Sequence, residues 1–222
     1  MGYFSPPDPQ LTGIKYGNWG SRPFEYFWAA GAADLRGSDV LDIGIGLPSE
    51  HTWHEFVRDA LQPKTYLGID IDERIKNEEI DTGTHRVLYM DASMIDLRDN
   101  SLDYIFSLST FEHFEDPALF IKVIAECHRV LRPQGKMIVT LDEFWENNRQ
   151  DCLPWNELER AWKRDGREFN VVSYGMVDFA KDISKYFTSV DKPVLKSNKD
   201  ATLLHNTTYN VCVSHGVFEV NK

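Results

Sequence analysis

The stretch Val40-Leu41-Asp42-Ile43-Gly44-Ile45-Gly46 joins a short apolar run to two closely spaced glycines. The run predicts a buried strand over 39–43, and a helix is expected from Ser49 to Leu61, just before Pro63. Glycines let the backbone turn sharply and approach a ligand without an intervening Cβ, and the start of a helix offers free N–H groups. The stretch therefore predicts a strand, a loop and a helix that hold a nucleotide-like cofactor.

The same alternation of apolar runs and amphipathic segments continues outward from this stretch. We expect further strands over four ranges: 65–70, 86–91, 102–107 and 136–141. Helices are expected from Ser21 to Gly37 and from Pro117 up to Pro133. Strands that alternate with helices in this way form a parallel sheet that is covered on both faces.

The C-terminal part of the chain is less regular. It contains a helix candidate at 176–186 and strand candidates near 189–195 and 209–220, which would close one edge of the sheet. The sequence therefore predicts one α/β domain with a doubly wound, mostly parallel seven-stranded sheet and a C-terminal antiparallel edge. We expect an N-terminal arm and helix in 1–38, the cofactor-binding core in 39–141, and the acceptor-side segment with the closing strands in 142–222.

The composition is that of an acidic globular protein. Lys and Arg total 24 against 35 Asp and Glu, which gives a formal net charge of −11. Such a surface does not attract nucleic acid or anionic lipid over a broad face. No apolar stretch approaches the roughly 20 residues of a membrane helix, and residues 1–20 lack the pattern of a signal peptide. Together with three widely spaced cysteines, this predicts a cytoplasmic protein with no nucleic-acid or membrane partner.

Three acidic residues are expected at the carboxyl edge of the sheet, where open α/β folds bind their ligands. Asp42 precedes the glycine loop, Asp70 ends the second strand and Asp91 ends the third. A dinucleotide would need a third glycine where Ser49 stands, and Asp42 would repel its pyrophosphate. Asp42 instead suits a cofactor that carries an ammonium group and no phosphate. Asp70 can accept both hydroxyls of a ribose, and Asp91 can reach the exocyclic amine of an adenine.

With these motifs the sequence resembles the class I S-adenosylmethionine-dependent methyltransferases. The matching blocks, in chain order, are Val40–Gly46, Leu67–Asp70, Met90–Ala92, Leu102–Ser107 with Phe111–Pro117, and Glu126–Lys136. The Phe111–Pro117 and Glu126–Lys136 blocks resemble the small-molecule subgroup that includes the ubiquinone-biosynthesis type. The resemblance spans 39–141 and implies a Rossmann-like methyltransferase fold with S-adenosylmethionine as cofactor. The chain departs from the family pattern at Pro48, where a third glycine is usual.

The resemblance also implies where the cofactor would lie. Asp42 would sit near the methionine amino group, Asp70 would hold the ribose, and Ser107 would line the methionine end. The other cofactor contacts that it implies are Gly44, Gly46, Ile71, Asp91 and Ala92. From the arm, Trp19 could close over the cofactor, as lids do when they exclude water.

The expected reaction is an in-line displacement of a methyl group from a sulfonium, in which the protein aligns an acceptor and removes a proton. His113 is predicted as the general base, because a neutral imidazole can take a hydroxyl proton near neutral pH. The alternative is that His113 packs the loop before Pro117, and Glu112 carries the same two interpretations. No metal is expected at the acidic cluster around His113, nor at His51-Thr52-Trp53-His54-Glu55, which lacks the His-Glu-x-x-His order.

The acceptor is predicted to be a small molecule. Ser107-Leu108-Ser109-Thr110 stands where methyltransferases that act on nucleobases often carry an Asn/Asp-Pro-Pro-Tyr loop, and the charge of −11 also disfavours a nucleic-acid acceptor. The leading prediction is a hydroxyl on a sugar or an envelope-glycan precursor. The alternatives are a protein or nucleic-acid acceptor, a non-catalytic cofactor-binding module, and a nicotinamide-dependent oxidoreductase. The oligomeric state is left open, with a homodimer among the options.

Overall fold

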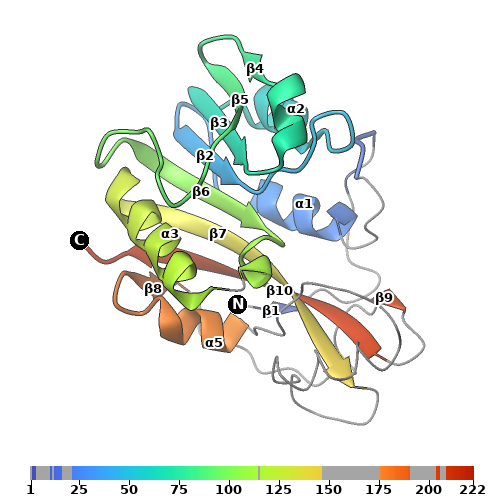
Figure 1. Ribbon diagram of the computed structural model, residues 1–222, viewed down its shortest axis with the longest axis vertical. Helices are drawn as coiled ribbons and strands as arrows, with labels where there is room; N and C mark the ends of the chain where they lie inside the picture. Colours follow the sequence, from blue (N-terminus) through green and yellow to red (C-terminus); the bar gives the residue numbers. More distant parts are fainter. Residues whose placement is uncertain are drawn as a thin grey trace.

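A computed structural model describes residues 2–3, 11, 13–16, 22–114, 116–146, 176–190, 204–205 and 209–222. Within this part of the chain, ten strands form one sheet at the centre of the molecule (Figure 1). Its parallel part comprises β2 (Asp39–Ile43), β3 (Thr65–Asp70), β5 (His85–Tyr89), β6 (Leu102–Leu108) and β7 (Leu131–Glu146). These strands lie in the order β5-β3-β2-β6-β7, and each pairs in parallel with its neighbour.

The C-terminal segment closes one edge of the sheet with antiparallel pairing. The strand β10 (Tyr209–Val220) runs antiparallel to β7, and β8 (Phe187–Ser189) pairs with β10. Three two-residue strands extend the sheet: β1 (Gly2–Tyr3), β4 (Ile80–Asp81) and β9 (Leu204–His205). The predicted mostly parallel sheet with a C-terminal antiparallel edge is confirmed. Near the strand expected at 189–195, the structure describes β8 at Phe187–Ser189, and residues 191–195 lie outside the described residues.

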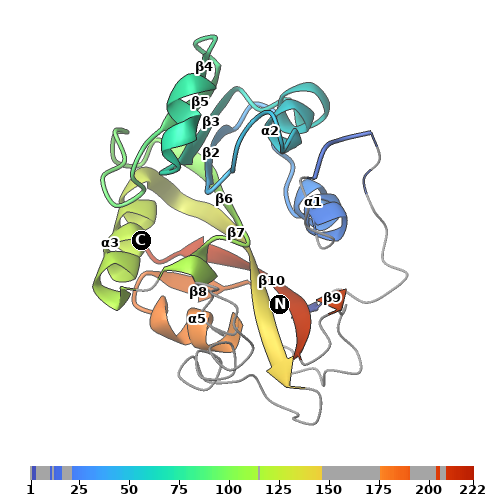
Figure 2. The ribbon, with the colours of Figure 1, turned by 45° about the vertical axis from the view of Figure 1, so that its right-hand side comes forward.

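Helices cover both faces of the sheet, as Figure 2 shows. The helices α1 (Arg22–Gly31) and α2 (Trp53–Phe56) lie on one face, while α3 (Pro117–Val130) and α5 (Met176–Asp182) lie on the other. Each face has its own apolar cluster, with Tyr26 and Trp53 in one and Phe120 and Phe179 in the other. Because both faces are covered, every residue of β2 is buried. Among the described helices, none has both the length and the hydropathy needed to cross a membrane.

The two longest helices begin and end at residues that suit those positions. Asp116 accepts a hydrogen bond from Ala118 N (2.8 Å) and Pro117 occupies the first turn of α3, so the predicted start of this helix is confirmed. The helix α1 ends at Gly31 and not at Gly37 as predicted, because Gly31 is the first residue that strongly disfavours a helix. Gly37 instead occupies a turn with φ +73° that leads into β2.

The helix predicted from Ser49 begins only at Trp53, so this prediction was wrong at its N-terminus. Ser49 N donates to Glu78 Oε2 (2.9 Å), and Thr52 N donates to the Lys15 carbonyl oxygen (3.2 Å). These bonds satisfy N–H groups that the start of a helix would have offered to a ligand. The segment after the second glycine is therefore a turn that other parts of the protein hold in place.

Candidate cofactor and acceptor site

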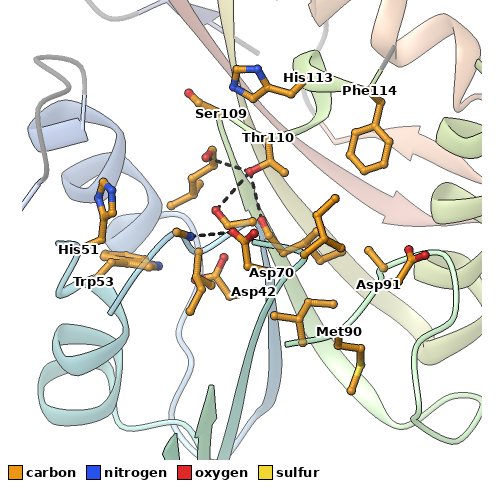
Figure 3. Close-up of a pocket in the computed structure, with 18 of the residues that line it drawn as sticks. Asp42, His51, Trp53, Asp70, Met90, Asp91, Ser109, Thr110, His113 and Phe114 are labelled. Atoms are coloured by element: carbon orange, nitrogen blue, oxygen red, sulfur yellow. Dashed lines mark hydrogen bonds between the residues drawn. The ribbon is translucent and has the colours of Figure 1, made fainter. Parts of the chain in front are cut away.

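A cavity of about 610 Å³ opens at the carboxyl edge of the parallel strands. Its walls come from the ends of β2, β3 and β6, the turn after β5, and residues of α1, α2 and α3. In Figure 3, Asp42 and Asp70 lie in the middle, Asp91 lies toward one side, and Ser109 and His113 lie at another end. We call this last part of the cavity the Ser109 end. The volume is typical of a small-molecule site.

The glycine loop after β2 has a shape that favours glycine. Gly44 and Gly46 have φ values of +76° and +66°, in the left-handed region. A Cβ on Gly44 would lie 2.3 Å from the Thr110 side chain, and one on Gly46 would lie 2.9 Å from the His51 ring. Because both positions exclude a side chain, the loop lines the cavity with its backbone, which suits a ligand that approaches closely.

Asp42 is a buried carboxyl group on the wall of the cavity. It is 2% exposed, and the Tyr66 hydroxyl donates a hydrogen bond to its Oδ2 (2.9 Å). Burial raises the pKa of Asp42 to about 7, while the Tyr66 hydrogen bond and the charge of Arg22 oppose the rise. A cationic ligand group beside Asp42 would favour its ionised form.

Asp70 ties the end of β3 to the glycine loop. Its Oδ2 accepts from Gly46 N (2.9 Å), and its Oδ1 accepts from Asp72 N (2.9 Å). Each carboxylate oxygen has a second lone pair and can still accept a ligand hydroxyl. Beside Asp70, Ile71 is 64% exposed and also lines the cavity, which gives an apolar surface for a ring.

Asp91 lies in the turn after β5, beyond the observed end of that strand. Its Oδ1 accepts from Ser93 N (2.7 Å), and Ala92 beside it is buried against the cavity. The turn continues into a loop that α3 holds, because Glu126 Oε2 accepts from Ile95 N (2.9 Å). Asp91 is therefore presented on a segment that hydrogen bonds fix at both ends of the turn.

The predicted residues near the end of β6 lie in different environments. His113 is exposed and lines the Ser109 end, whereas Glu112 is fully buried and does not line the cavity. Ser107, predicted to line the methionine end, is also fully buried within β6 and is not among the residues that line the cavity. Trp19 lies outside the described residues.

The structure adds Arg22 and Ser109 to the site, two residues that sequence reasoning did not select. Arg22 lines the cavity from α1, where its Nη1 donates to the Leu108 carbonyl oxygen (2.8 Å) and pairs with Glu25 (3.1 Å). Ser109 lines the cavity from the turn after β6, and its hydroxyl donates to Glu25 Oε2 (2.7 Å). The sequence feature that could have indicated Arg22 is the presence of two charged residues, Arg22 and Glu25, in the first turn of an otherwise apolar helix.

The two histidines that follow the glycine loop lie in different environments. His51 lines the cavity, while His54 is buried and lies 3.2 Å (Nδ1 to Nε2) from the buried His85. Within the described residues, no group of three or more His, Cys, Asp or Glu side chains is placed to hold a metal ion.

The chain is similar in sequence to known methyltransferases. Residues 41–139 match the family model described as "Methyltransferase domain". The chain is 29% identical over 122 residues to the "Ubiquinone biosynthesis O-methyltransferase" of Paracidovorax citrulli. The aligned region covers 51% of this chain and 47% of that protein. It is 27% identical over 136 residues to a Mycolicibacterium smegmatis protein with the name "Probable S-adenosylmethionine-dependent methyltransferase", over 59% of this chain and 48% of that one. The chain thus spans about half the length of these curated relatives.

Solved structures share the fold at low sequence identity. The PH0226 protein of Pyrococcus horikoshii matches with a TM-score of 0.59 and 18% identity, over 92% of this chain and 93% of that chain. A second match is a Burkholderia thailandensis 1,6-didemethyltoxoflavin-N1-methyltransferase, solved with 1,6-didemethyltoxoflavin and S-adenosylhomocysteine. Its TM-score is 0.56 at 14% identity, over 89% of this chain and 79% of that chain.

Fold, site and relatives point to one class. Residues 41–139 match a methyltransferase domain, and the chain is similar to S-adenosylmethionine-dependent methyltransferases. S-Adenosylmethionine is the cofactor of that class, and the carboxylates around the glycine loop are hydrogen-bond acceptors of the kind that its ammonium and hydroxyl groups need.

Proposed function

We propose that the protein transfers a methyl group from S-adenosylmethionine to a hydroxyl of a small molecule. The observation that carries this proposal is the placement of Asp42, Asp70 and Asp91 around one cavity with the glycine loop between them. When bound, the cofactor supplies an electrophilic methyl group on a sulfonium, so the protein has only to bind, orient and deprotonate.

Each cofactor-binding residue has a proposed partner. Asp42 faces the ammonium group, because a buried carboxyl group is stabilised as an anion by a neighbouring cation. Asp70 accepts the ribose hydroxyls while it keeps its bond to Gly46 N. Asp91 accepts from the adenine amine, and the exposed side chain of Ile71 covers the ring.

The acceptor is proposed to occupy the Ser109 end of the cavity. This end combines hydroxyl and imidazole groups with the apolar side chains of Phe114 and Leu119, which suits a ring that carries several hydroxyls. A sugar or an envelope-glycan precursor has this chemistry. The name of the Paracidovorax citrulli relative, an O-methyltransferase, also favours oxygen as the methylated atom. The formal charge of −11 favours a small acceptor over a nucleic acid.

The remaining parts of the proposal concern the setting of the reaction. We propose one domain in which residues 1–38 and 142–222 complete the acceptor side of the core at 39–141. We also propose a cytoplasmic location, which the small number and wide spacing of the three cysteines favour.

Binding and product formation test the proposed function separately. Calorimetry with S-adenosylmethionine should show binding at one site per chain, and Asp70→Asn should weaken it. Extracts of sugars, quinones and amines are then incubated with the protein and screened by mass spectrometry for a gain of one CH₂ unit. A protein that does not bind the cofactor would refute the proposal, and binding without any methylated product would favour the non-catalytic module.

A further inference from the structure

A fully buried carboxylate lies behind the Ser109 end of the cavity. Glu25 is 0% exposed, and its Oε2 accepts three hydrogen bonds, from Arg22 Nη1 (3.1 Å), Ser109 Oγ (2.7 Å) and Thr140 Oγ1 (2.5 Å). Its Oε1 is equally buried and has no hydrogen-bond partner among the described residues. A carboxylate that is removed from water and keeps one oxygen unused is costly, so it points to a role beyond packing.

Ser109 connects this carboxylate to the cavity. The serine lines the cavity, and its φ of +45° lies in a region that residues with a Cβ rarely adopt. Thr140 holds this conformation, because its hydroxyl accepts from Ser109 N (2.9 Å) while its carbonyl accepts from the same N–H (3.1 Å). The strain therefore serves to aim the Ser109 side chain between Glu25 and the cavity.

The position of Ser109 also places it next to the cofactor loop. Its neighbour Thr110 packs against Gly44 so closely that a Cβ on that glycine would lie 2.3 Å away. The Thr110 hydroxyl also donates to the Ile43 carbonyl oxygen (3.2 Å), at the end of β2. An acceptor at the Ser109 end would thus lie beside the loop that is proposed to carry the methionine part of the cofactor.

We propose that Ser109 takes the proton of the acceptor hydroxyl and that Glu25 is the base that drives this transfer; the proposal rests on the function proposed above. The acceptor oxygen forms a bond to the methyl carbon, the bond from that carbon to sulfur breaks, and the sulfur keeps the electron pair. The hydroxyl proton passes to Ser109 Oγ while the proton of Ser109 passes to Glu25. The products are a methyl ether, neutral S-adenosylhomocysteine and a protonated Glu25, which later releases its proton to solvent.

The charge balance favours this route. Methyl transfer removes the positive charge of the sulfonium, and protonation of Glu25 removes a negative charge from the same region. Because two opposite charges vanish together, the net charge of the site is the same before and after the transfer. Arg22 forms an ion pair with Glu25, because its guanidinium lies 3.1 Å from Oε2. Ser109 is therefore the catalytic residue, because it contacts the acceptor hydroxyl, and Glu25 acts on the acceptor through Ser109.

Two variants test this proton relay, from the acceptor hydroxyl through Ser109 to Glu25, so that the test does not depend on a single mutation. Glu25→Gln keeps the shape of the side chain and removes its basicity. Ser109→Gly removes the hydroxyl and adopts a positive φ without strain, so a loss of activity does not come from backbone strain. Ser214→Ala is the matched control, because Ser214 is 1% exposed, donates to the Leu141 carbonyl oxygen (3.4 Å) and does not line the cavity.

The measurements are the cofactor dissociation constant, the turnover number against pH, and the infrared band of a protonated carboxyl group in a single turnover. The acceptor used is the compound that gives the strongest methylated product in the screen described above. Both variants should bind the cofactor as the wild-type protein does, lose roughly 10²–10⁴-fold in turnover, and lose the rise of turnover with pH. The infrared band should appear in the wild-type protein and be absent from Glu25→Gln, and Ser214→Ala should behave like the wild-type protein.

Three results would overturn the relay. Full activity in Glu25→Gln or Ser109→Gly would exclude it, and loss of turnover only in His113→Gln would assign the proton to His113 instead. A slower Glu25→Gln with an unchanged pH profile would mean that Glu25 is structural. A wild-type protein that binds no cofactor would refute the proposed function itself, and the relay with it, so the two failures are distinguishable.

Discussion

Cofactor affinity should depend on pH through Asp42. Burial raises the pKa of this carboxyl group to about 7, with the Tyr66 hydrogen bond and the charge of Arg22 acting in the opposite direction. If the ammonium group of the cofactor pairs with the ionised form, binding must first ionise Asp42. The ionised fraction falls from about 90% at about pH 8 to about 10% at about pH 6, so the dissociation constant should rise about tenfold over this range.

The assay is titration calorimetry with S-adenosylhomocysteine, which carries the same ammonium group and cannot transfer a methyl group. Buffers of different ionisation enthalpy would show the release of about half a proton per site on binding at about pH 7, and of nearly one proton at about pH 6. Asp42→Asn should bind more weakly at high pH and lose the pH dependence. Tyr66→Phe removes a hydrogen bond that lowers the pKa of Asp42, so the transition should move to higher pH. An affinity that is equal at both ends of the range would refute the ammonium role of Asp42.

Three further predictions address the loop, the ribose contact and the buried histidines. Asp70→Asn should weaken cofactor binding by about 1–3 kcal/mol because hydroxyl partners are lost, and an unchanged dissociation constant would exclude the ribose role. Gly44→Ala should lower the free energy of unfolding by about 1–3 kcal/mol, because its Cβ would meet Thr110 and its φ is +76°; a urea titration that shows no loss would contradict this. Burial, then the nearby charge of His54, lowers the pKa of His85 from 6.5 to about 4, so the folded protein binds fewer protons than the unfolded chain between these values. The wild-type protein should therefore lose about 3 kcal/mol relative to His85→Gln as the pH falls through that window, and parallel stability curves for the two proteins would disprove the assignment.

The parts of the site that sequence reasoning predicted are those made by local chemistry. Asp42, Gly44 and Gly46 follow one another in the chain, and their placement at the end of β2 depends only on a strand that ends in a sharp turn. Asp70 could be predicted for the same reason, because it is the last residue of β3. Its bond to Gly46 N spans two strands and has no sequence signal.

Positions near the end of β6 show why sequence reasoning did not select Ser109. Ser107 and Ser109 are two residues apart and would share one face if the strand continued, so the difference between them depends on where the strand ends. The strand ends at Leu108, which leaves Ser107 buried within it and places Ser109 in a turn with positive φ. A shift of the strand end by one or two residues is within the usual uncertainty of a sequence-based boundary. The start of α2 was missed for a related reason, because Glu78 and Lys15 fix the preceding turn from distant parts of the chain.

The burial of Glu25 required information that lies far away in the sequence. In a helix such as α1, an acid in the first turn normally complements the helix dipole at the surface. Here its partners Ser109 and Thr140 lie 84 and 115 residues further along the chain. A buried charge costs folding free energy even when it is paired, and an apolar residue of similar volume is often at least as stabilising. Folding stability alone therefore gives no reason for an acid at this position, whereas a base behind the Ser109 end does. On this argument α1 belongs to the reaction site as much as the glycine loop does, although it lies outside the region that matches the family.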